Sequence, residues 1–466
     1  MKTFSILLIS LLGSISLSAQ DIIGQWNGAL KVQGTQLRLV FNVTKTDSGF
    51  SSTMDSPDQG AKGIPTTTTS FENSILKITI ASAKIEYEGT LGQDNVIVGT
   101  FNQGGQSFPM NLSKEKIEKE KFVRPQEPTK PYSYYSEDIT FENKKAGINL
   151  AGTLTLPKKE GVFPVVILIS GSGPQNRDEE LLGHKPFLVL SDYLTKNGFA
   201  VFRYDDRGTA LSKGDFKTAT SADFATDVES AILYLKTRKE INNKKMGLIG
   251  HSEGGLIAPM VASKSKDVAF IVLLAGTGIQ GDQILLLQQK LIGKATGVSE
   301  EDLQKNELTN RKAFDIVNKS NNLEQLKSDL TNFIKKELKD NPNSGKPTEM
   351  SDDDFVDLQV KQIATPWMQY FIKYDPAPVL QKVKCPVFAI NGEKDLQVPP
   401  KENLEAIKKA LTKGGNNKVT TKVFPNLNHL FQECKTGSPD EYASIEQTFS
   451  PTALTEVLKW LQTQTK

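Results

Sequence analysis

The sequence predicts an α/β fold in which a parallel sheet, covered on both faces, is interrupted by a helical insertion and preceded by a small all-β domain. Three observations support this prediction. After about residue 135, short continuous apolar runs alternate with helical stretches, which is typical of buried parallel strands. A segment at about 280–375 keeps helical spacing without any strand signal. Residues 20–115 instead alternate apolar and polar side chains, which predicts strands with one buried face.

Five apolar runs predict the strands of the parallel sheet. Between the second and third runs we expect a helix, because Thr220 and Asp223 form a possible capping box before an amphipathic stretch. The long helical segment falls between the fourth and fifth runs, so it should form a cap above the sheet. The five predicted strands are 165–169, 199–202, 246–249, 269–274 and 387–390.

The first part of the mature chain is predicted to be a separate domain. The short alternating strands of residues 20–115 suggest a small barrel or sandwich. Trp26 and Phe101 are expected in its core, although they could line a ligand cavity. Residues 116–134 are rich in charge and proline and are interpreted as a linker. Residues 135–466 then form the α/β domain that contains the insertion.

The first 19 residues have the features of a signal peptide. Lys2 provides a positive start, an apolar run follows, and small residues precede Ala19. We expect cleavage after Ala19, which leaves Gln20 first, with cleavage after Ser18 as the alternative. The protein is therefore expected to be exported, to the periplasm or outside the cell. No other segment approaches the 18 apolar residues of a spanning helix, so no stable membrane insertion is expected.

Charge and motif content exclude several classes of function. The 56 Lys and Arg residues nearly balance the 54 Asp and Glu residues, giving a net charge of +2 without long charged blocks. This gives no electrostatic reason to expect a nucleic-acid partner. Three scattered histidines, no zinc motif and no phosphate-binding loop argue against a metal and against any cofactor. Cys385 and Cys434 are interpreted as separate thiols, although a disulfide stays possible.

The sequence Gly250-His251-Ser252-Glu253-Gly254 directly follows the predicted strand 246–249. This G-x-S-x-G pattern between a buried strand and a helix is typical of the nucleophile elbow of α/β hydrolases. The glycines permit the sharp turn that raises the serine hydroxyl above the sheet edge. We therefore predict Ser252 as the nucleophile.

A nucleophilic serine needs a base and an orienting acid. In this fold the chain order is serine, acid, histidine, and among the three histidines only His429 follows the serine and the acid loop. The side chain of His251 is expected to point away from the base position, and His184 precedes the serine. The loop after strand 387–390 offers Asp395 and Glu393 as the acid. We favour Asp395, with Glu393 as the alternative.

Two backbone N–H groups should bind the developing oxyanion. The residue after the nucleophile, Glu253, supplies one, and the glycine-rich loop after strand 165–169 supplies the other. We assign this second donor to Ser172, with Gly171 or Gly173 as alternatives. Arg207 and the two aspartates before it are expected to tie loops together beside the site rather than to act on substrate.

These motifs together resemble bacterial exported α/β-hydrolases described as serine aminopeptidase-like or dienelactone-hydrolase-like carboxylesterases. The resemblance implies that Ser252, Asp395 and His429 form the catalytic triad, and that the β-domain is the small domain preceding some of these enzymes. Residues 209–212 depart from the pattern, because many relatives carry a further glycine there. The matching stretches are ISGSGPQNRDE (169–179), FAVFRYDDRG (199–208), GLIGHSEGG (247–255), CPVFAINGEKDLQVPP (385–400), FPNLNHLFQ (424–432), GQWNGAL (24–30) and SPDQGAKGIP (56–65).

The expected activity is hydrolysis of carboxylic esters through an acyl-enzyme. Trp367 and Phe371, near the end of the insertion, are candidates to line the acyl pocket, although packing of the cap is an equal alternative. A small ester or a short peptide is the expected partner, since the motifs do not separate an esterase from an aminopeptidase-like enzyme. A binding protein with an inactive hydrolase domain is the third hypothesis. The sequence does not predict an oligomeric state.

Overall fold

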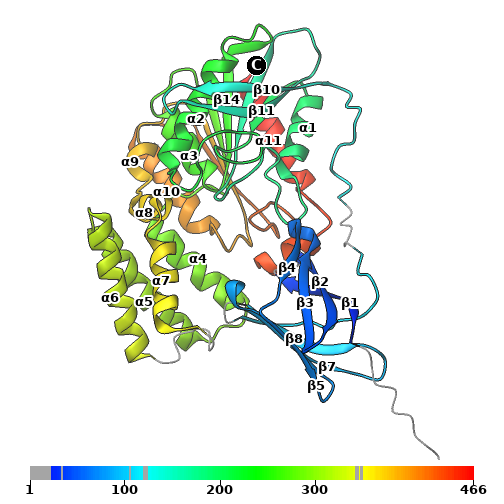
Figure 1. The fold of residues 1–466 in the computed structure, drawn as a ribbon. Helices are drawn as coiled ribbons and strands as arrows, with labels where there is room; N and C mark the ends of the chain where they lie inside the picture. The colour runs from blue at the N-terminus through cyan, green and yellow to red at the C-terminus, as the bar shows by residue number, and fades with distance from the viewer. Residues whose placement is uncertain (1–21, 33–34, 104–105, 119–123, 342–345, 347–349) are drawn as a thin grey trace, which may run out of the picture. The chain divides into compact units, whose positions relative to one another are not determined.

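The computed structural model describes residues 22–466 apart from five short internal segments. The predicted signal peptide, residues 1–19, lies outside the described residues. The chain divides into two compact units, one formed by residues before 120 apart from 33–35, and one formed essentially by residues 120–466 (Figure 1). The five internal segments not described are 33–34, 104–105, 119–123, 342–345 and 347–349.

The N-terminal unit consists of two antiparallel sheets with four and five strands. Neighbouring strands pair through short turns, as the alternating sequence predicted. Short 3-10 turns, η1 (Pro57–Gln59) and η2 (Ala81–Ala83), join some of the strands. The strands are β1 (Gly24–Val32), β2 (Thr35–Thr46), β3 (Gly49–Ser56) and β4 (Ala61–Pro65) in one sheet, and β5 (Thr68–Glu72), β6 (Ile75–Ile80), β7 (Ile85–Leu91), β8 (Ile97–Gln103) and β9 (Gln106–Pro109) in the other.

Both sheets of the N-terminal unit bury their alternating side chains in one shared core. Trp26 is 1% exposed, and its indole N–H donates to the carbonyl oxygen of Ile22 at 2.7 Å. Phe101 and Tyr87 are also buried there, and the Tyr87 hydroxyl donates to the Met110 carbonyl oxygen at 3.2 Å. Trp26 and Phe101 are therefore core residues.

The C-terminal unit is built on an eight-stranded sheet with the order β10-β11-β13-β12-β14-β15-β16-β17. From β13 to β17 all neighbouring strands are parallel, while β10 and β11 form an antiparallel hairpin at one edge. The strands are β10 (Tyr135–Asn143), β11 (Ile148–Leu156), β12 (Phe163–Ile169), β13 (Ala200–Tyr204), β14 (Ile241–His251), β15 (Phe270–Leu274), β16 (Val387–Gly392) and β17 (Val419–Phe424).

Helices cover both faces of this sheet, so its central strands are apolar throughout. One hydrophobic cluster joins the sheet to α1 and α11, and another joins the opposite face to α2, α3, α9 and α10 (Figure 1). The predicted capping box of α2 is present, with the Thr220 amide and the Asp223 carboxylate 2.9 Å apart. The helices are α1 (Pro186–Lys196), α2 (Ser221–Leu235), α3 (Gly254–Ala262), α9 (Ala377–Leu380), α10 (Pro400–Lys413) and α11 (Pro451–Gln464), with η3 (Pro439–Ser444) before α11.

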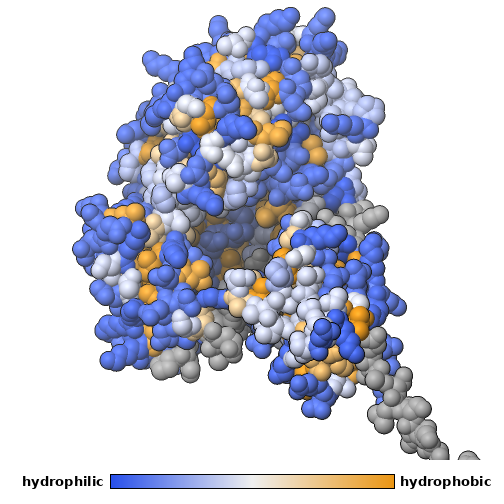
Figure 2. Space-filling model, viewed as in Figure 1, coloured by the Kyte–Doolittle hydropathy of each residue, from blue (hydrophilic) through white to orange (hydrophobic). Residues whose placement is uncertain are grey.

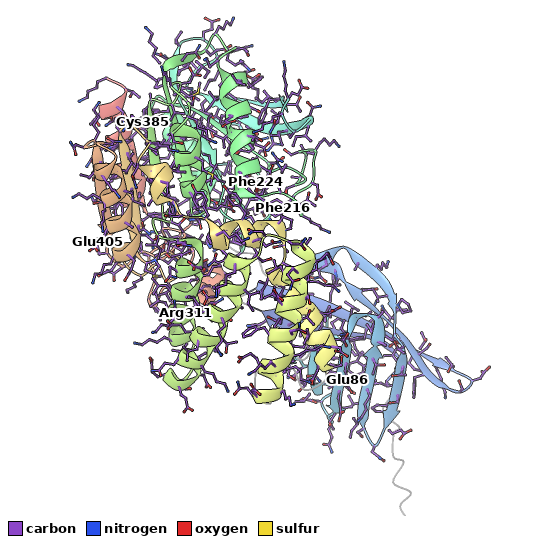
Figure 3. The ribbon with its side chains drawn as sticks, turned by 90° about the vertical axis from the view of Figure 1, so that its left-hand side faces the viewer. Glu86, Phe216, Phe224, Arg311, Cys385 and Glu405 are labelled. Atoms are coloured by element: carbon purple, nitrogen blue, oxygen red, sulfur yellow. The ribbon has the colours of Figure 1, made fainter. Side chains whose placement is uncertain are left out.

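The segment between β15 and β16 is the helical insertion. Four of its helices begin at a side chain that accepts a hydrogen bond from the first turn, as capping residues do. The insertion has a hydrophobic cluster of its own, and Figure 3 shows its helices from the side with Arg311 on α5. Its helices are α4 (Gly281–Ala295), α5 (Glu300–Lys319), α6 (Leu323–Asp340), α7 (Asp352–Ile363) and α8 (Pro366–Lys373).

The predicted fold class is confirmed, namely an α/β sheet covered by helices, with a helical insertion and all-β sheets before it. One detail differs, because the sheet is mixed: the β10–β11 hairpin adds two antiparallel strands that the sequence analysis did not predict. Polar side chains cover most of the visible face of the C-terminal unit, while apolar ones gather on the insertion near α7 (Figure 2). Among the described residues, no helix is long and apolar enough to span a membrane.

Candidate active site

Ser252 occupies a sharp turn between β14 and α3. Its φ angle is +52°, in the left-handed region that non-glycine residues rarely adopt. The turn is held by the Ser252 amide, which donates to the Leu274 carbonyl oxygen at 2.8 Å. Strain of this kind is typical of a nucleophile elbow.

The glycines on both sides of Ser252 are required by close backbone contacts. A Cβ on Gly250 would lie 2.0 Å from the carbonyl oxygen of Gly254, and a Cβ on Gly254 would lie 2.1 Å from that of Ile169. Neither contact can be relieved by moving a side chain. The G-x-S-x-G pattern is therefore dictated by the packing of α3 against β12 and β14.

His429 lies in the loop after β17 and is paired with Asp395. The His429 Nδ1 atom is 2.9 Å from Asp395 Oδ2, and both side chains are buried. The other oxygen, Asp395 Oδ1, accepts hydrogen bonds from the amides of Gln397 and Val398 at 2.9 and 2.8 Å. Glu393 is exposed and instead accepts from the Asn426 amide. Of the two candidate acids, the structure places Asp395 against the histidine.

The Asp395 contact fixes the protonation pattern of His429. A carboxylate at Nδ1 requires that nitrogen to carry hydrogen, which leaves Nε2 unprotonated in the neutral ring. No hydrogen bond joins the Ser252 hydroxyl to His429 among the described residues. Such contacts are often long in ligand-free sites and shorten when substrate binds.

The loop after β12 passes beside Ser252. A Cβ placed on Gly171 would be 3.2 Å from the Ser252 Cβ. The Gly171 amide donates to Glu179 Oε1 at 2.7 Å, so it is not free to bind an oxyanion. The Ser172 amide donates to no described residue, and the Glu253 amide lies at the start of α3, where N–H groups lack helical acceptors. Ser172 and Glu253 therefore stay the predicted oxyanion donors, with Gly173 as the alternative.

Two aspartates after β13 hold this loop in position. Asp206 accepts from the Ser170 hydroxyl at 2.8 Å and from the Gln175 amide at 3.0 Å. Asp205 binds the Arg177 guanidinium, with 2.7 Å between Asp205 Oδ2 and Arg177 Nη2. The predicted role of these aspartates as ties between loops is confirmed.

The arginine of the same motif ties a different pair of elements. Arg207 pairs with Asp227 of α2 at 2.8 Å. Its guanidinium also lies over the ring of Phe224 at 5.9 Å, and that ring stacks on Phe216 (Figure 3). Arg207 therefore has a structural role, as the sequence analysis expected, but it anchors the loop after β13 to helix α2 rather than to another loop.

His251 contacts His429, the predicted base, contrary to the expectation that its side chain points away from the base position. His251 Nε2 is 3.0 Å from the His429 carbonyl oxygen, and the two rings are 4.8 Å apart. His251 Nδ1 is 2.9 Å from Glu179 Oε1. Burial alone would lower the pKa of His251, but the charge and hydrogen bond of Glu179 outweigh it and raise the pKa.

The side chain of Glu253 connects the elbow to the insertion. Its Oε1 atom accepts from the Trp367 indole N–H at 2.8 Å and from the Ser221 hydroxyl at 2.5 Å. Burial raises the pKa of Glu253, while these two donors oppose that shift. Trp367 also stacks on Phe371 with 5.0 Å between ring centroids. Trp367 thus reaches the elbow, whereas Phe371 is buried in the core between the insertion and the sheet.

The remaining histidine and the two cysteines have no place in this site. His184 is buried, with Nε2 2.9 Å from the Tyr442 carbonyl oxygen and Nδ1 3.0 Å from the Thr448 hydroxyl. Burial lowers its pKa to about 4, so it packs as a neutral ring. Cys385 and Cys434 are free thiols. No group of three or more side chains suited to hold a metal occurs in the described part of the chain.

Sequence reasoning missed two features of the site. The first is the Glu179–His251 pair, since nothing in the sequence shows that a glutamate eight residues beyond Gly171 returns to the elbow. The second is the buried Glu253 side chain, because only its backbone was considered. The available signal was a titratable side chain next to each glycine of the elbow, namely His251 beside Gly250 and Glu253 beside Gly254.

Comparison with known proteins places the chain among hydrolases. The family model of the alpha/beta hydrolase fold matches residues 164–436. Esterase EstD of Thermotoga maritima is 30% identical over 303 residues, which are 64% of this chain and 61% of EstD. The chain therefore matches less than two thirds of that relative.

Several solved structures are similar to this chain at low sequence identity. Alpha/beta hydrolase GrgF from Penicillium sp. sh18 is 14% identical, with a TM-score of 0.45 over 71% of this chain and 99% of GrgF. The Pyrococcus furiosus esterase Pf2001 is 16% identical, with a TM-score of 0.44 over 74% of this chain and 97% of the esterase. Est1E from Butyrivibrio proteoclasticus, solved with ferulic acid, is 16% identical, with a TM-score of 0.42 over 70% of this chain and 99% of Est1E.

Proposed function

The chain belongs to the alpha/beta hydrolase family, and from that premise we propose that it is a serine hydrolase that cleaves carboxylic esters through an acyl-enzyme. The observation that carries the proposal is the position of three side chains at one edge of the sheet. Ser252 follows β14, while Asp395 and His429 follow β16 and β17. Because these strands are parallel, the loops after them meet at the same edge.

In the proposed mechanism, His429 Nε2 takes the proton from the Ser252 hydroxyl as its oxygen attacks the ester carbonyl carbon. The Asp395 carboxylate stabilises the imidazolium that forms. The amides of Ser172 and Glu253 bind the oxyanion. His429 then protonates the leaving alcohol, and water releases the acyl group by the reverse sequence.

An ester substrate is favoured over a peptide chain end by the state of the nearby carboxylates. An aminopeptidase-like enzyme would need a carboxylate to bind the substrate amine. Glu253 is occupied by Trp367 and Ser221, and Glu179 by Gly171 and His251. Turnover of acyl p-nitrophenyl esters should therefore exceed turnover of aminoacyl-anilides, and the reverse ranking would make the peptidase the better proposal.

The nucleophile is tested by Ser252→Ala. We expect kcat on a short p-nitrophenyl ester to fall by about a thousandfold or more, because the attacking oxygen is removed. Labelling by a fluorophosphonate probe should disappear in parallel. Ser263→Ala, the same change at the other end of α3, should keep wild-type turnover and labelling. Near-wild-type turnover in Ser252→Ala would refute the proposal.

A further inference from the structure

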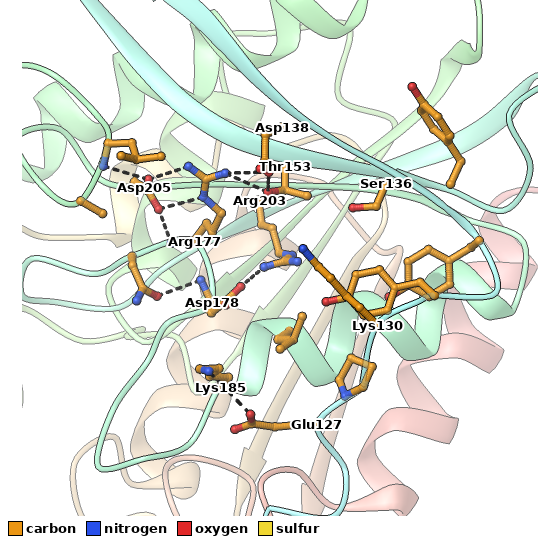
Figure 4. Close-up of a pocket in the computed structure, with 18 of the residues that line it drawn as sticks. Glu127, Lys130, Ser136, Asp138, Thr153, Arg177, Asp178, Lys185, Arg203 and Asp205 are labelled. Carbon is orange, nitrogen blue, oxygen red and sulfur yellow. Dashed lines mark hydrogen bonds and ion pairs between the residues drawn. The ribbon is translucent and has the colours of Figure 1, made fainter.

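A concave site lies in the C-terminal unit away from the predicted triad. Its cavity volume is about 1230 Å³, and its lining includes none of Ser252, Asp395 and His429. It lies between the segment before β10 and the far end of the loop that follows β12 (Figure 4). The site is therefore distinct from the proposed esterase centre.

Arg203 of β13 lines this cavity, and only part of the hydrogen-bonding capacity of its guanidinium is satisfied. The residue is 5% exposed, and its Nη1 atom pairs with Asp178. Its Nε atom is buried without a hydrogen-bond partner among the described residues. Burial lowers the pKa of Arg203 to about 10, so it stays charged at neutral pH. A buried donor without an acceptor is costly, and this one belongs to a cation.

Lys130 brings a second cation to the same cavity. Figure 4 shows the side chains of Lys130 and Arg203 pointing toward one another. The lysine is exposed, and within the described ranges no carboxylate pairs with it. Two positive groups that face one another repel, and a negative group between them would reverse the sign of the interaction.

The carboxylates that line the cavity do not supply the negative group between Lys130 and Arg203. Four of them line it, and each is already paired with another lining residue. Among the lysines and arginines that line the cavity, Lys130 is thus the one that does not pair with a lining carboxylate. The pairs are Asp138 and Asp205 with Arg177, Glu127 with Lys185, and Asp178 with Arg203.

Beside the two cations the cavity has an aromatic wall. Tyr132 and Tyr134 stack with 5.1 Å between ring centroids and an angle of 11°. Lys130 Nζ lies 5.9 Å from the Tyr132 ring. At the rim, the Leu211 side chain is 70% exposed. Aromatic side chains beside a small number of polar groups are typical of sites that bind small organic ligands.

We propose that this cavity binds a small organic anion whose carboxylate or phosphate lies between Lys130 and Arg203 and whose planar apolar body lies against Tyr132. Charge-assisted hydrogen bonds from both cations hold the anionic group. The ring of the ligand extends the stack of tyrosines.

Isothermal titration of the full chain with phenyl phosphate, benzoate and phenol tests this site. Phenyl phosphate and benzoate should bind, and their relative affinities decide between phosphate and carboxylate, while the uncharged phenol should not. Lys130→Gln should weaken binding of the preferred anion by about tenfold, the loss expected for one charge-assisted hydrogen bond. Raising the salt concentration should weaken binding further.

Lys159→Gln is the matched control. Lys159 is also exposed and also lies over a tyrosine ring, 5.8 Å from Tyr135, but it does not line the cavity. This variant should bind the anions like the wild type, and both variants should keep the basal esterase rate. Lys130→Glu, which reverses the charge, should abolish binding. Absence of binding to the wild type, equal binding of phenol, or unchanged binding in Lys130→Glu would overturn the proposal.

Discussion

His251 holds both ring nitrogens against acceptor atoms. Nε2 faces the His429 carbonyl oxygen, and Nδ1 faces Glu179 Oε1. The same Glu179 oxygen also accepts a hydrogen bond from the Gly171 amide. A ring with two acceptors needs two protons. Although burial opposes the shift, the charge and hydrogen bond of Glu179 raise the pKa of His251 and so favour its imidazolium form beside the predicted base. The contact of Nε2 with the His429 carbonyl oxygen holds the loop that carries His429.

This charge state predicts a pH-dependent role for Glu179. The folded pKa of His251 is raised, so the pair stabilises the fold fully below the ordinary histidine pKa of about 6.5 and loses this contribution as pH rises through the raised value. We expect Glu179→Gln to lower the free energy of unfolding by about 1–3 kcal/mol near pH 6. The difference from wild type should shrink toward pH 9, as measured by urea unfolding at several pH values.

Glu180→Gln is the control for that change. Glu180 is the next residue along the chain and is exposed, and its side chain accepts one hydrogen bond, from the Asn176 amide group at 3.3 Å. Its substitution should leave the pH profile of stability unchanged. A Glu179→Gln profile parallel to that of the wild type would show that His251 is not charged by this pair.

At the scale of residues, the sequence predicted those site residues whose roles follow from their order along the chain. Ser252, Asp395 and His429 follow from a motif, a scarcity of histidines and the order of strands. Glu179 could not be predicted in the same way, because its contact with His251 depends on how the loop after β12 turns back. Gly171 illustrates the same limit, since the sequence could not show that its amide is occupied.

At the scale of elements, helix α8 is attached directly to the nucleophile elbow. Trp367 crosses from the insertion to the buried carboxylate of Glu253, which neighbours Ser252 in the chain. The same carboxylate accepts from Ser221 at the start of α2. Movement of the insertion is thereby coupled to the residue that donates an oxyanion hydrogen bond in the proposed mechanism.

Trp367→Phe removes the donor and keeps an aromatic ring against Phe371. We expect kcat/KM for a short ester to fall about two- to tenfold, equivalent to a lost hydrogen bond of about 0.5–1.5 kcal/mol. The loss should be in kcat if the contact positions Glu253, and in KM if Trp367 only lines the acyl pocket. Steady-state kinetics separate the two.

Trp460→Phe provides the same chemical change at a distance. Trp460 lies on α11 and stacks on Phe388 with 5.4 Å between ring centroids, on the sheet face opposite α3. Its substitution should leave kcat and KM near wild-type values. Equal losses in the two variants would indicate a general effect of tryptophan removal.

The sequence predicted an element correctly where the hydrophobic periodicity of a segment and its length indicated the same kind of structure. The insertion was recognised because about 95 residues of helical spacing separate two adjacent strands. The β10–β11 hairpin was missed, since its first strand alternates with exposed side chains while its second is buried almost throughout. Neither strand has the continuous apolar run by which the sequence analysis recognised the central strands of the sheet.

At the scale of the whole molecule, the chain has separate hydrophobic cores. The core of the N-terminal unit contains only residues before 120, and the clusters of the C-terminal unit contain only residues after it. Each unit therefore buries its own apolar surface, which is the condition for independent unfolding.

Trp26→Ala tests this independence. Trp26 is among the largest fully buried side chains, so its removal should cost about 3–5 kcal/mol in the N-terminal unit. Calorimetry should show one transition shifted to lower temperature and a second one unchanged, with esterase activity on a short ester retained. A single transition that shifts as a whole would show that the two units unfold together.

The hydrogen bonds of His251 also have a consequence for the order of folding. They join Glu179, His251 and His429, which are separated by 72 and 178 positions along the chain. Contacts between such distant segments form only after the intervening strands have paired, because closing large loops is slow. During refolding, ellipticity should therefore recover before hydrolytic activity, because the secondary structure forms before the contacts of His251 assemble the proposed active site.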